Sequence, residues 1–395
     1  MKYWQSITLG VVVAALSACG GSPYDDNTSA KKPPAAAPQL LDEVDQNARI
    51  SGRYGHTLAL TDGGQVYAWG ANVFGQLGSA NNQTESQAQL VTGLSRIRAV
   101  QTGMSHSLAL HQDGRVFAWG NGQNGELGLN VAQVIYPTQI AGLSGVKEIT
   151  SGFSQNLAVD QNGAVWGWGT SFAMNNPVPT RLHGLSNVKA VAAGNDFGLA
   201  LTEAGQVFAW GANGQGQLGI GGYSQSVTPV MLGLSKVRSL AAGYNHSLAL
   251  LENGFVMAWG SNQTGQLGTG QFLNALSPLP VSGLSNVKAI AASTYNSMAL
   301  LNNGKVMVWG HGGFGQLGNG GYTNAIVPIY LPGVANAISI SSGHGYTQVV
   351  LANGQILSMG NNNFGQLGTG NYQSASSAVM VKGLSARQTY QAAKR

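Results

Sequence analysis

Short runs of alternating apolar and polar residues recur along most of the chain and predict β-strands. In one clear unit, residues 237–242 and 246–251 each follow this pattern. Successive side chains of a strand point to opposite faces, so a period of two is typical of a strand with one buried face. Residues 256–259 and the segment around 279–281 continue in the same way. The pattern therefore predicts four short strands in each unit.

The turn between the second and third predicted strands has the strongest local signature. Five units place asparagine or aspartate before glycine there, and two units have Gly-Gly or Ala-Gly. Such pairs tolerate positive φ and predict type I′ hairpins. The pairs are Gly63-Gly64, Asp113-Gly114, Asn162-Gly163, Ala204-Gly205, Asn253-Gly254, Asn303-Gly304 and Asn353-Gly354.

A tryptophan–glycine pair ends the third predicted strand in six units, and methionine–glycine stands in the seventh place. The intervals between these positions are 50, 49, 42, 49, 50 and 50 residues. A period near 50 in a β-rich chain predicts the blades of a propeller. We expect the first residue of each pair to be a structural position of the repeat: Trp69, Trp119, Trp168, Trp210, Trp259, Trp309 and Met359.

A glycine-rich bend follows this pair in every unit but the third, and it reads Gly-Gln-Leu-Gly or Gly-Glu-Leu-Gly. Its leucine is expected to pack in the core. Together with the preceding Gly-Leu-Ser, His-Ser-Leu-Ala-Leu and Asn-Gly segments, the unit resembles the regulator-of-chromosome-condensation repeat. The resemblance covers about residues 49–384. It implies an all-β, seven-bladed β-propeller with four-stranded blades.

The two ends of the repeat region complement each other. The first unit lacks a preceding Gly-Leu-Ser element, and the chain supplies a surplus one at residues 383–385. We therefore expect N- and C-terminal halves of one repeat unit to pair and close the ring. Closure leaves few exposed strand edges. The propeller is predicted to span residues 48–385, followed by a tail at 386–395.

Composition favours a folded protein with a large core. Only 8% of the residues are charged, against about 25% in ordinary globular domains, and 43% are hydrophobic, which supports a large core. Residues 49–384 hold 13 basic and 9 acidic side chains. This balance is thin for nucleic-acid recognition, which needs dense Lys/Arg patches. We expect an unknown protein partner, no nucleic acid and a monomeric chain.

The N-terminus predicts export and lipidation. Lys2 precedes an apolar run at residues 7–18, and Leu16-Ser17-Ala18-Cys19 follows. This segment resembles a bacterial lipoprotein signal peptide over residues 1–18, which implies acylation of Cys19, the single cysteine of the chain. Residues 19–47 are rich in Pro and Ala and predict a flexible linker. Gly20 implies the outer membrane by the same resemblance. The alternative is an ordinary secretory signal with a coincidental cysteine.

No catalytic, metal or cofactor signature stands out in the sequence. Two glycine-rich matches to a dinucleotide fingerprint, at 214–219 and 313–318, belong to the repeat bend and open no helix. His56, His106 and His246 share one register, 13 residues before their tryptophan. Other units place Gln, Phe, Asn or Tyr there, which favours hydrogen-bonded structural positions over a metal ring. No cofactor is expected.

One aromatic residue per unit is the strongest binding candidate. Tyr223, Phe272, Tyr322 and Tyr372 each lie four residues after the bend, where the first two units have Asn82 and Ala132. Because these four residues share one position in the repeat, we expect them to form an arc on one propeller face. Aromatic residues are favoured in binding hot spots. The alternative is packing of each loop onto its own blade. The third unit lacks the bend, which predicts a notch beside this arc.

A second recurring position is basic. It lies in the first strand of five successive units and alternates there with apolar neighbours. One interpretation is a solvated strand face, and the other is weak attraction of an acidic partner. The residues are Arg98, Lys147, Lys189, Arg238 and Lys288.

These observations favour a lipid-anchored envelope protein whose propeller is a protein-interaction scaffold and not an enzyme. By resemblance, bacterial members of the family include a secreted protein inhibitor of β-lactamase, which implies inhibition of an envelope or extracellular enzyme as a special case. The resemblance also implies guanine-nucleotide exchange, the activity of the eukaryotic founding member, but export argues against it. A propeller hydrolase or lyase is a further alternative.

Overall fold

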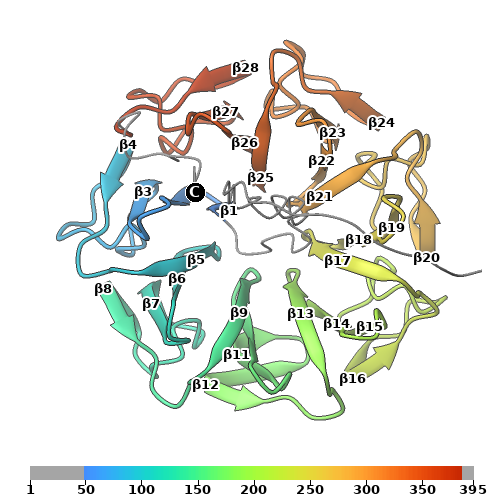
Figure 1. Cartoon of the computed structure of the whole chain (residues 1–395), viewed down its shortest axis with the longest axis horizontal. Helices are drawn as coiled ribbons and strands as arrows, with labels where there is room; N and C mark the ends of the chain where they lie inside the picture. The colour runs from blue at the N-terminus through green and yellow to red at the C-terminus, as the bar shows by residue number, and fades with distance from the viewer. Residues whose placement is uncertain (1–48, 385–395) are drawn as a thin grey trace, which may run out of the picture. The chain divides into compact units, whose positions relative to one another are not determined.

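The computed structural model describes residues 49–384, and within this range 28 strands form without any helix. The strands build seven four-stranded antiparallel sheets, which stand as blades around one axis (Figure 1). The predicted all-β, seven-bladed propeller with four-stranded blades is confirmed. Within the same range, no helix has the length and apolarity to cross a membrane. The predicted signal peptide (1–18), Cys19 with its linker (19–47) and the tail (386–395) lie outside the described residues.

Each blade uses four consecutive strands, with the first nearest the axis and the fourth at the rim. The first strands are β1 (Ile50–Gly52), β5 (Ile97–Thr102), β9 (Val146–Ser151), β13 (Val188–Ala193), β17 (Val237–Ala242), β21 (Val287–Ala292) and β25 (Ala337–Gly343). The second strands are β2 (His56–Leu60), β6 (His106–His111), β10 (Gln155–Asp160), β14 (Phe197–Thr202), β18 (His246–Leu251), β22 (Asn296–Leu301) and β26 (Tyr346–Leu351). The third strands are β3 (Val66–Gly70), β7 (Val116–Asn121), β11 (Val165–Ser171), β15 (Val207–Gly211), β19 (Val256–Gly260), β23 (Val306–Gly310) and β27 (Ile356–Gly360). The fourth strands are β4 (Glu85–Leu90), β8 (Gln133–Gln139), β12 (Met174–Arg181), β16 (Ser226–Met231), β20 (Ala275–Pro280), β24 (Ala325–Tyr330) and β28 (Ala375–Met380).

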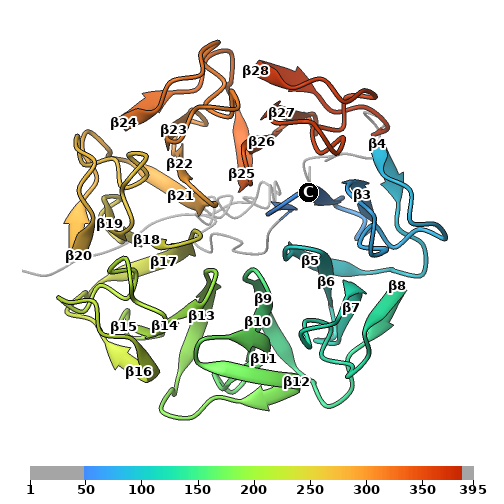
Figure 2. The ribbon, with the colours of Figure 1, turned by 180° about the vertical axis from the view of Figure 1, so that it is seen from behind.

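The ring closes between the seventh and first sheets, and here the prediction needs a correction. Strands β1–β4 all come from the N-terminal end of the described chain and β25–β28 from its C-terminal end, so no sheet mixes the two (Figure 2). The reason is that Ile50–Gly52 already supplies an inner strand to the first sheet. The C-terminal segment therefore finds no vacant strand position and lies along β4 instead.

The closing contact repeats the contact between other blades. The Gly370 amide donates to the Ser86 carbonyl at 2.8 Å, as the Gly320 amide donates to the Ser376 carbonyl at 2.9 Å one blade earlier. A further bond, from the Ala88 amide to the Lys382 carbonyl at 3.1 Å, joins the surplus C-terminal segment to the first blade. The first and seventh blades are thus joined by an ordinary interface between blades.

The turn between the second and third strands differs from the type I′ hairpin predicted above. Gly254 has φ +80°, but Asn253 is not among the residues with positive φ, and type I′ requires both. The Gly254 amide instead donates to the Leu251 carbonyl at 3.0 Å, and the left-handed glycine follows this closed turn. The pair therefore forms the three-residue hairpin that ends in a left-handed glycine.

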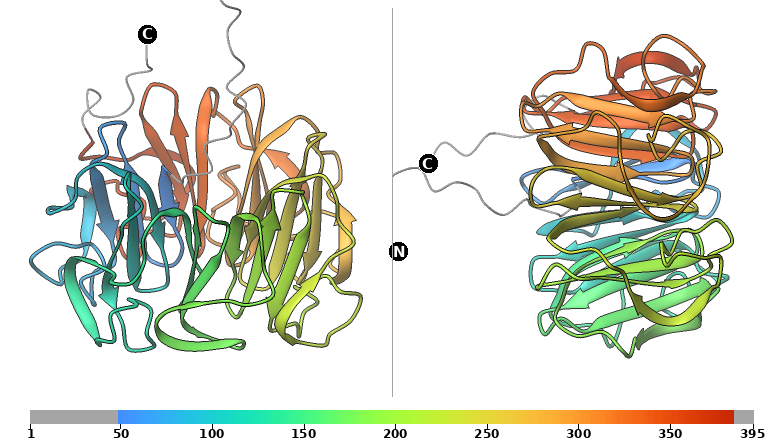
Figure 3. Two further views of the ribbon diagram at one scale, coloured as in Figure 1. Left: turned by 60° about the horizontal axis from the view of Figure 1, so that its bottom comes forward. Right: turned by 90° about the vertical axis from the view of Figure 1, so that its right-hand side faces the viewer.

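The two ends of the ring carry different connections (Figure 3). One end, here called the loop face, holds the turns between first and second strands and the connections between third and fourth strands. The other end, here called the basic face, holds the turns between second and third strands and the links to the next blade. All seven blades contribute to both faces.

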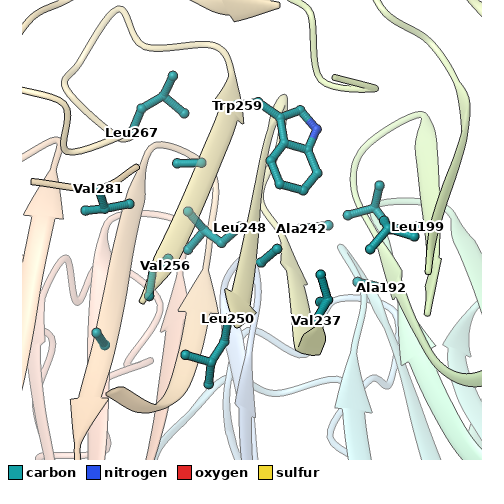
Figure 4. Close-up of a cluster of buried hydrophobic side chains, with 14 of the residues drawn as sticks. Ala192, Leu199, Val237, Ala242, Leu248, Leu250, Val256, Trp259, Leu267 and Val281 are labelled. Carbon is teal, nitrogen blue, oxygen red and sulfur yellow. The ribbon is translucent and has the colours of Figure 1, made fainter. Parts of the chain in front are cut away.

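The core lies between neighbouring sheets, where the predicted structural positions are buried (Figure 4). Trp259 lies against the bend of the preceding blade, and its indole Nε1 donates to the Gln217 carbonyl at 2.9 Å. A Cβ at Gly219 would lie 2.8 Å from this indole, so the bend requires glycine there. The bend leucines, such as Leu267, are buried as predicted.

Two interfaces between blades lack this indole bond. Met359 replaces tryptophan in the seventh blade and packs its sulfur against Gly318, but a thioether donates no hydrogen bond. The third blade lacks the bend, because a tight turn from Ser171 to Met174 joins β11 directly to β12. Trp210 in the fourth blade is therefore buried without a bend to receive its indole proton.

Candidate interaction surface

Charge is distributed very unevenly between the two faces. Of the 13 basic and 9 acidic side chains in residues 49–384, the basic face holds twelve and six. The loop face holds one basic residue, Arg53, and the acidic Glu85, Glu126 and Asp196. The basic residues of the basic face are Arg49, Arg96, Arg98, Arg115, Lys147, Arg181, Lys189, Lys236, Arg238, Lys288, Lys305 and Lys382.

The four aromatic candidates lie on the loop face, in the connections between third and fourth strands. Tyr223, Phe272, Tyr322 and Tyr372 are 58%, 53%, 60% and 53% exposed. Each is more than half exposed, so packing within the blade does not account for these side chains. Their role in binding stays a prediction.

A buried asparagine holds the loop under three of these aromatic residues. Asn262, which is fully buried, donates its Nδ2 to the Gln271 carbonyl at 2.7 Å and to the Leu273 carbonyl at 3.0 Å, on either side of Phe272. Its Oδ1 accepts from the Leu267 amide at 2.9 Å. Because the flanking carbonyls point inward to this amide, the ring between them is presented outward.

The same arrangement recurs at Tyr223 and Tyr372. Asn213 donates to the carbonyls of Gly222 and Ser224 at 2.8 and 2.9 Å. Asn362 donates to the carbonyls of Asn371 and Gln373 at 2.9 and 3.0 Å. In the sixth blade Gly312 replaces the asparagine, and its amide donates to Asn324 Oδ1 at 3.1 Å.

These loops also bind the next blade, which places the four aromatic residues at successive blade junctions. The amides of Gly221, Gly270, Gly320 and Gly370 donate to carbonyls on the fourth strands of the fifth, sixth, seventh and first blades, respectively, at 2.8–2.9 Å. The arc therefore runs from the fourth blade to the first. The shortened third blade and the loops with Asn82 and Ala132 occupy the remaining sector, as the sequence predicts.

A second aromatic group at the axis of the loop face was not found from the sequence. The turns between first and second strands converge there and bring together Tyr54, Phe153, Tyr244, Tyr295 and His344, here called the aromatic circuit. Each ring contacts the next, and the circle closes from His344 back to Tyr54, with centroids 5.2–6.3 Å apart. Contacts in this range stabilise aromatic pairs.

The circuit extends outward through one further loop. His311 lies 6.2 Å from Tyr295, and Phe314 lies 5.5 Å from His311 and 6.2 Å from His344. Phe314 is 40% exposed and Tyr295 is 41% exposed. The aromatic surface therefore reaches from the axis toward the connections that carry Tyr322.

Arg53 enters the centre of this group from the first blade. It stands where five of the other six blades have glycine, such as Gly103 and Gly243. Its Nη2 donates across the axis to the Ala193 carbonyl of the fourth blade at 2.5 Å and to the Ala242 carbonyl of the fifth at 3.5 Å. Burial lowers the pKa of Arg53 to about 10, so the guanidinium remains charged at neutral pH.

A sequence signal for the circuit exists in the repeat register. The residue two positions before each second strand reads Tyr54, Met104, Phe153, Asn195, Tyr244, Thr294 and His344. Aromatic or histidine side chains occupy four of these seven places. The register alone does not show that all seven turns meet at one axis, which is why this position was missed.

The shared histidine register is structural, as the sequence interpretation held. The Nε2 atoms of His56 and His246 lie 3.0 and 2.9 Å from the hydroxyls of Ser107 and Ser297, and each serine belongs to the next blade. His106 Nε2 lies 2.8 Å from Asn156 Oδ1 in the same way. Burial lowers the pKa of His56 and His246 to about 3, so both are neutral at pH 7.

The recurring basic position lies at the basic-face end of the inner strands. Arg98 is partly buried, and its Nη2 donates to the Val146 and Lys147 carbonyls of the next blade at 3.0 and 2.8 Å. Lys147 lies 3.5 Å from Glu203. Arg98 therefore has a structural role, while Lys288 at the same register is exposed. Within residues 49–384, no group of three His, Cys, Asp or Glu side chains is arranged to hold a metal ion.

Seven repeated sheets around one axis define a seven-bladed β-propeller with a loop surface at one end. Residues 170–394 match the family model of the RCC1-like domain, and residues 63–110, 113–159 and 97–126 match models of the regulator of chromosome condensation (RCC1) repeat. The first match covers more than half of the chain, so the chain belongs to the family of RCC1-like propellers.

Solved structures agree with this assignment. Prp20p from Saccharomyces cerevisiae, described with its binding to Gsp1p and histones, is 25% identical, with a TM-score of 0.74 over 80% of this chain and 86% of that chain. The yeast RCC1 (Prp20) bound by Kap60 is 25% identical, with a TM-score of 0.74 over 82% and 85%. Human WBSCR16 is 21% identical, with a TM-score of 0.70 over 80% and 94%, and shows the shared fold.

Proposed function

We propose that this protein is a protein-binding scaffold of the cell envelope, anchored by a lipid on Cys19, and that its loop face binds the partner. The observation that carries the proposal is the set of four exposed aromatic residues, three of which lie in loops held by a buried asparagine. Rigid aromatic side chains among uncharged Asn, Ser and Gly residues form the adaptable contact surfaces of antibody paratopes. The loop face combines the same two ingredients.

Relatives support a role in protein binding. Prp20p binds Gsp1p and histones, and the same yeast protein is bound by Kap60. Binding of proteins is therefore a use to which this propeller is put elsewhere in the family. We infer that the present chain uses its loop face in this manner, with inhibition of an envelope or extracellular enzyme as one form.

Charge supports the proposed orientation at a membrane. The basic face carries twelve basic and six acidic side chains within residues 49–384. This excess of basic side chains favours approach of the basic face to anionic lipid headgroups. Such an orientation turns the loop face away from the membrane, where a partner can reach it.

The decisive experiment is crosslinking and affinity capture of the full chain from intact envelopes. Replacing Tyr223, Phe272, Tyr322 and Tyr372 by serine should abolish capture of the partner. The matched control replaces Tyr136 and Tyr330, which are 48% and 57% exposed on fourth strands at the rim. Equal capture by the arc variant and the control variant, with both folded, contradicts the proposal.

The anchor is tested separately. Cys19→Ala should release the chain from washed membranes, because the acyl chains supply the apolar surface that holds it there. A chain that stays in the membrane fraction after this change is not held by a lipid on Cys19.

A further inference from the structure

We propose that the loop face contains a carboxylate-binding site at the propeller axis, with Arg53 as its anion-binding group. The site has its own geometry and does not depend on the arc of exposed aromatic residues. Its ligand is a monoanionic carboxylate with an apolar body, supplied by a small organic acid or by an acidic side chain of a docked protein.

The site is a narrow opening with mixed walls, lined by Arg53, Phe153, Asn195, Tyr244, Ser293 and Thr294. Its free space holds about one water molecule. The rings of Phe153 and Tyr244 meet edge to face at 5.5 Å and form an apolar wall. Ser293, Thr294 and Asn195 provide hydroxyl and amide groups. An opening of this size admits a carboxylate group, while the apolar body of the ligand would lie over the aromatic circuit.

The geometry of Arg53 leaves donors for a ligand. Both bonds that hold it, to the Ala193 and Ala242 carbonyls, leave from Nη2. A guanidinium also carries N–H groups on Nε and Nη1, and its planar fork matches the two oxygens of a carboxylate. The arginine is thus held in place by main-chain carbonyls while its remaining edge is suited to an acid.

The electrostatic surroundings also favour an anion. No ion pair within residues 49–384 includes Arg53, and carbonyl groups do not neutralise a cation. Arg53 is only partly exposed, and a partly desolvated charge without a counter-charge is costly. Asp196 neighbours Asn195 and accepts from its Nδ2 at 2.6 Å, and burial raises the pKa of this carboxyl. A bound carboxylate would supply the missing charge at Arg53 directly.

The single cation decides the ligand class. Arg53 is the only basic residue on the loop face of the described chain, so a dianionic phosphate would meet one positive charge. Phosphate sites normally gather several donors from Arg, Lys or helix termini. One planar cation between aromatic walls suits a monoanion with an apolar body better.

The test is calorimetric titration of the full-length protein with benzoate, with benzamide and inorganic phosphate as comparison ligands. Benzoate should bind in a saturable manner, at least tenfold tighter than the other two. Arg53→Gln should weaken benzoate binding at least tenfold. Equal binding of benzoate and benzamide, or tighter binding of phosphate, overturns the proposal.

A second variant keeps the test valid if Arg53→Gln fails to fold. Asn195→Asp places a carboxylate in the wall of the opening, where it should compete for Arg53 and weaken benzoate at least tenfold. Asn82→Asp, the same change on an exposed loop residue away from the axis, should leave benzoate affinity unchanged. Full benzoate affinity in Asn195→Asp contradicts the assignment.

The source of the carboxylate is resolved by competition. If a captured protein partner inserts an acidic side chain, benzoate at saturating concentration should displace it. Benzoate binding that leaves capture unchanged assigns the site to a small acid. Neither benzoate titration requires a partner, so failure of the proposed scaffold role and failure of this site are distinguishable.

Discussion

The two faces of this propeller are built from the same repeat but present opposite surfaces. The basic face holds twelve of the 13 basic side chains of residues 49–384, whereas the loop face holds one basic residue and the exposed aromatic residues. Local sequence explains the difference, because the loop-face connections consist almost entirely of uncharged residues, with Gly, Asn, Gln, Ser and aromatic residues prominent. One rigid ring can therefore separate electrostatic attraction at one end from specific recognition at the other.

The largest expected effect concerns the aromatic circuit. Replacing Tyr244 and Tyr295 together by alanine should lower partner affinity by at least a hundredfold, about 3 kcal/mol, because central aromatic residues dominate binding energies. Surface plasmon resonance with the captured partner measures this. Lipid binding of the same variant should not change. An equal loss of both would mean that the faces are not independent.

The next prediction tests whether the basic face binds anionic lipid. Replacing Lys189 and Lys288 by glutamine in a Cys19→Ala chain should weaken binding to vesicles of 70% neutral and 30% anionic phospholipid. The expected loss is about 2 kcal/mol, near thirtyfold, since each basic residue near such a surface contributes about 1 kcal/mol. Sedimentation with vesicles at two salt concentrations measures it. Unchanged binding, or binding that does not depend on salt, would remove the membrane role from this face.

The buried asparagines that hold the aromatic loops, such as Asn262, should keep those loops ordered for partner binding. Asn262→Ala removes donors to two buried-side carbonyls and should lower the free energy of unfolding by about 2 kcal/mol. Hydrogen exchange should rise most around Phe272, and partner affinity should fall by less than in the aromatic variants. Asn82→Ala is the matched control and should change neither stability nor exchange. Unchanged exchange around Phe272 would show that Asn262 does not order the loop.

Acid should lower the free energy of unfolding through the buried histidines that lie next to the loop face. The pKa of His246 is about 3 in the folded chain and about 6.5 when unfolded, so the unfolded state binds more protons between these values. The free energy of unfolding should therefore fall as pH drops below 6.5, by about 1.4 kcal/mol per pH unit for each such histidine. His246→Asn should reduce that slope because asparagine does not titrate, and the sixth blade accommodates asparagine at this register. Urea unfolding between pH 7 and 4 measures it, and an unchanged slope contradicts the assignment.

Most of the fold could be predicted from the repeat, and the reasons are local. The spacing of Trp-Gly pairs, the alternation of apolar residues and the buried bend leucines each recur at one register, so seven copies reinforce one interpretation. The register predicted that Tyr223 and Tyr372 lie on one face, but it left open whether they are exposed or packed onto their own blades. The prediction of a type I′ turn at Asn253-Gly254 was wrong. The type I′ turn and the three-residue hairpin favour the same residues and differ in their backbone angles.

The axial opening could not be predicted, because its parts come from five blades. Arg53 occupies a glycine position in one unit, which reads as ordinary variation in an aligned repeat. Its consequence depends on the carbonyls of Ala193 and Ala242, far away in sequence. The mode of ring closure was missed for a related reason, since pairing between distant strands is set by geometry.

The amino-acid pattern alone thus specified the number of blades, the strands within each blade and the residues that seal one blade to the next. These features depend on contacts within a unit or between adjacent units, and such contacts repeat with the sequence. Which side chains meet at the axis, and how charge is divided between the two ends, emerged only from the closed ring. Closure of the ring brings the turns of different blades together at the axis, and a local sequence pattern does not predict which residues come into contact there.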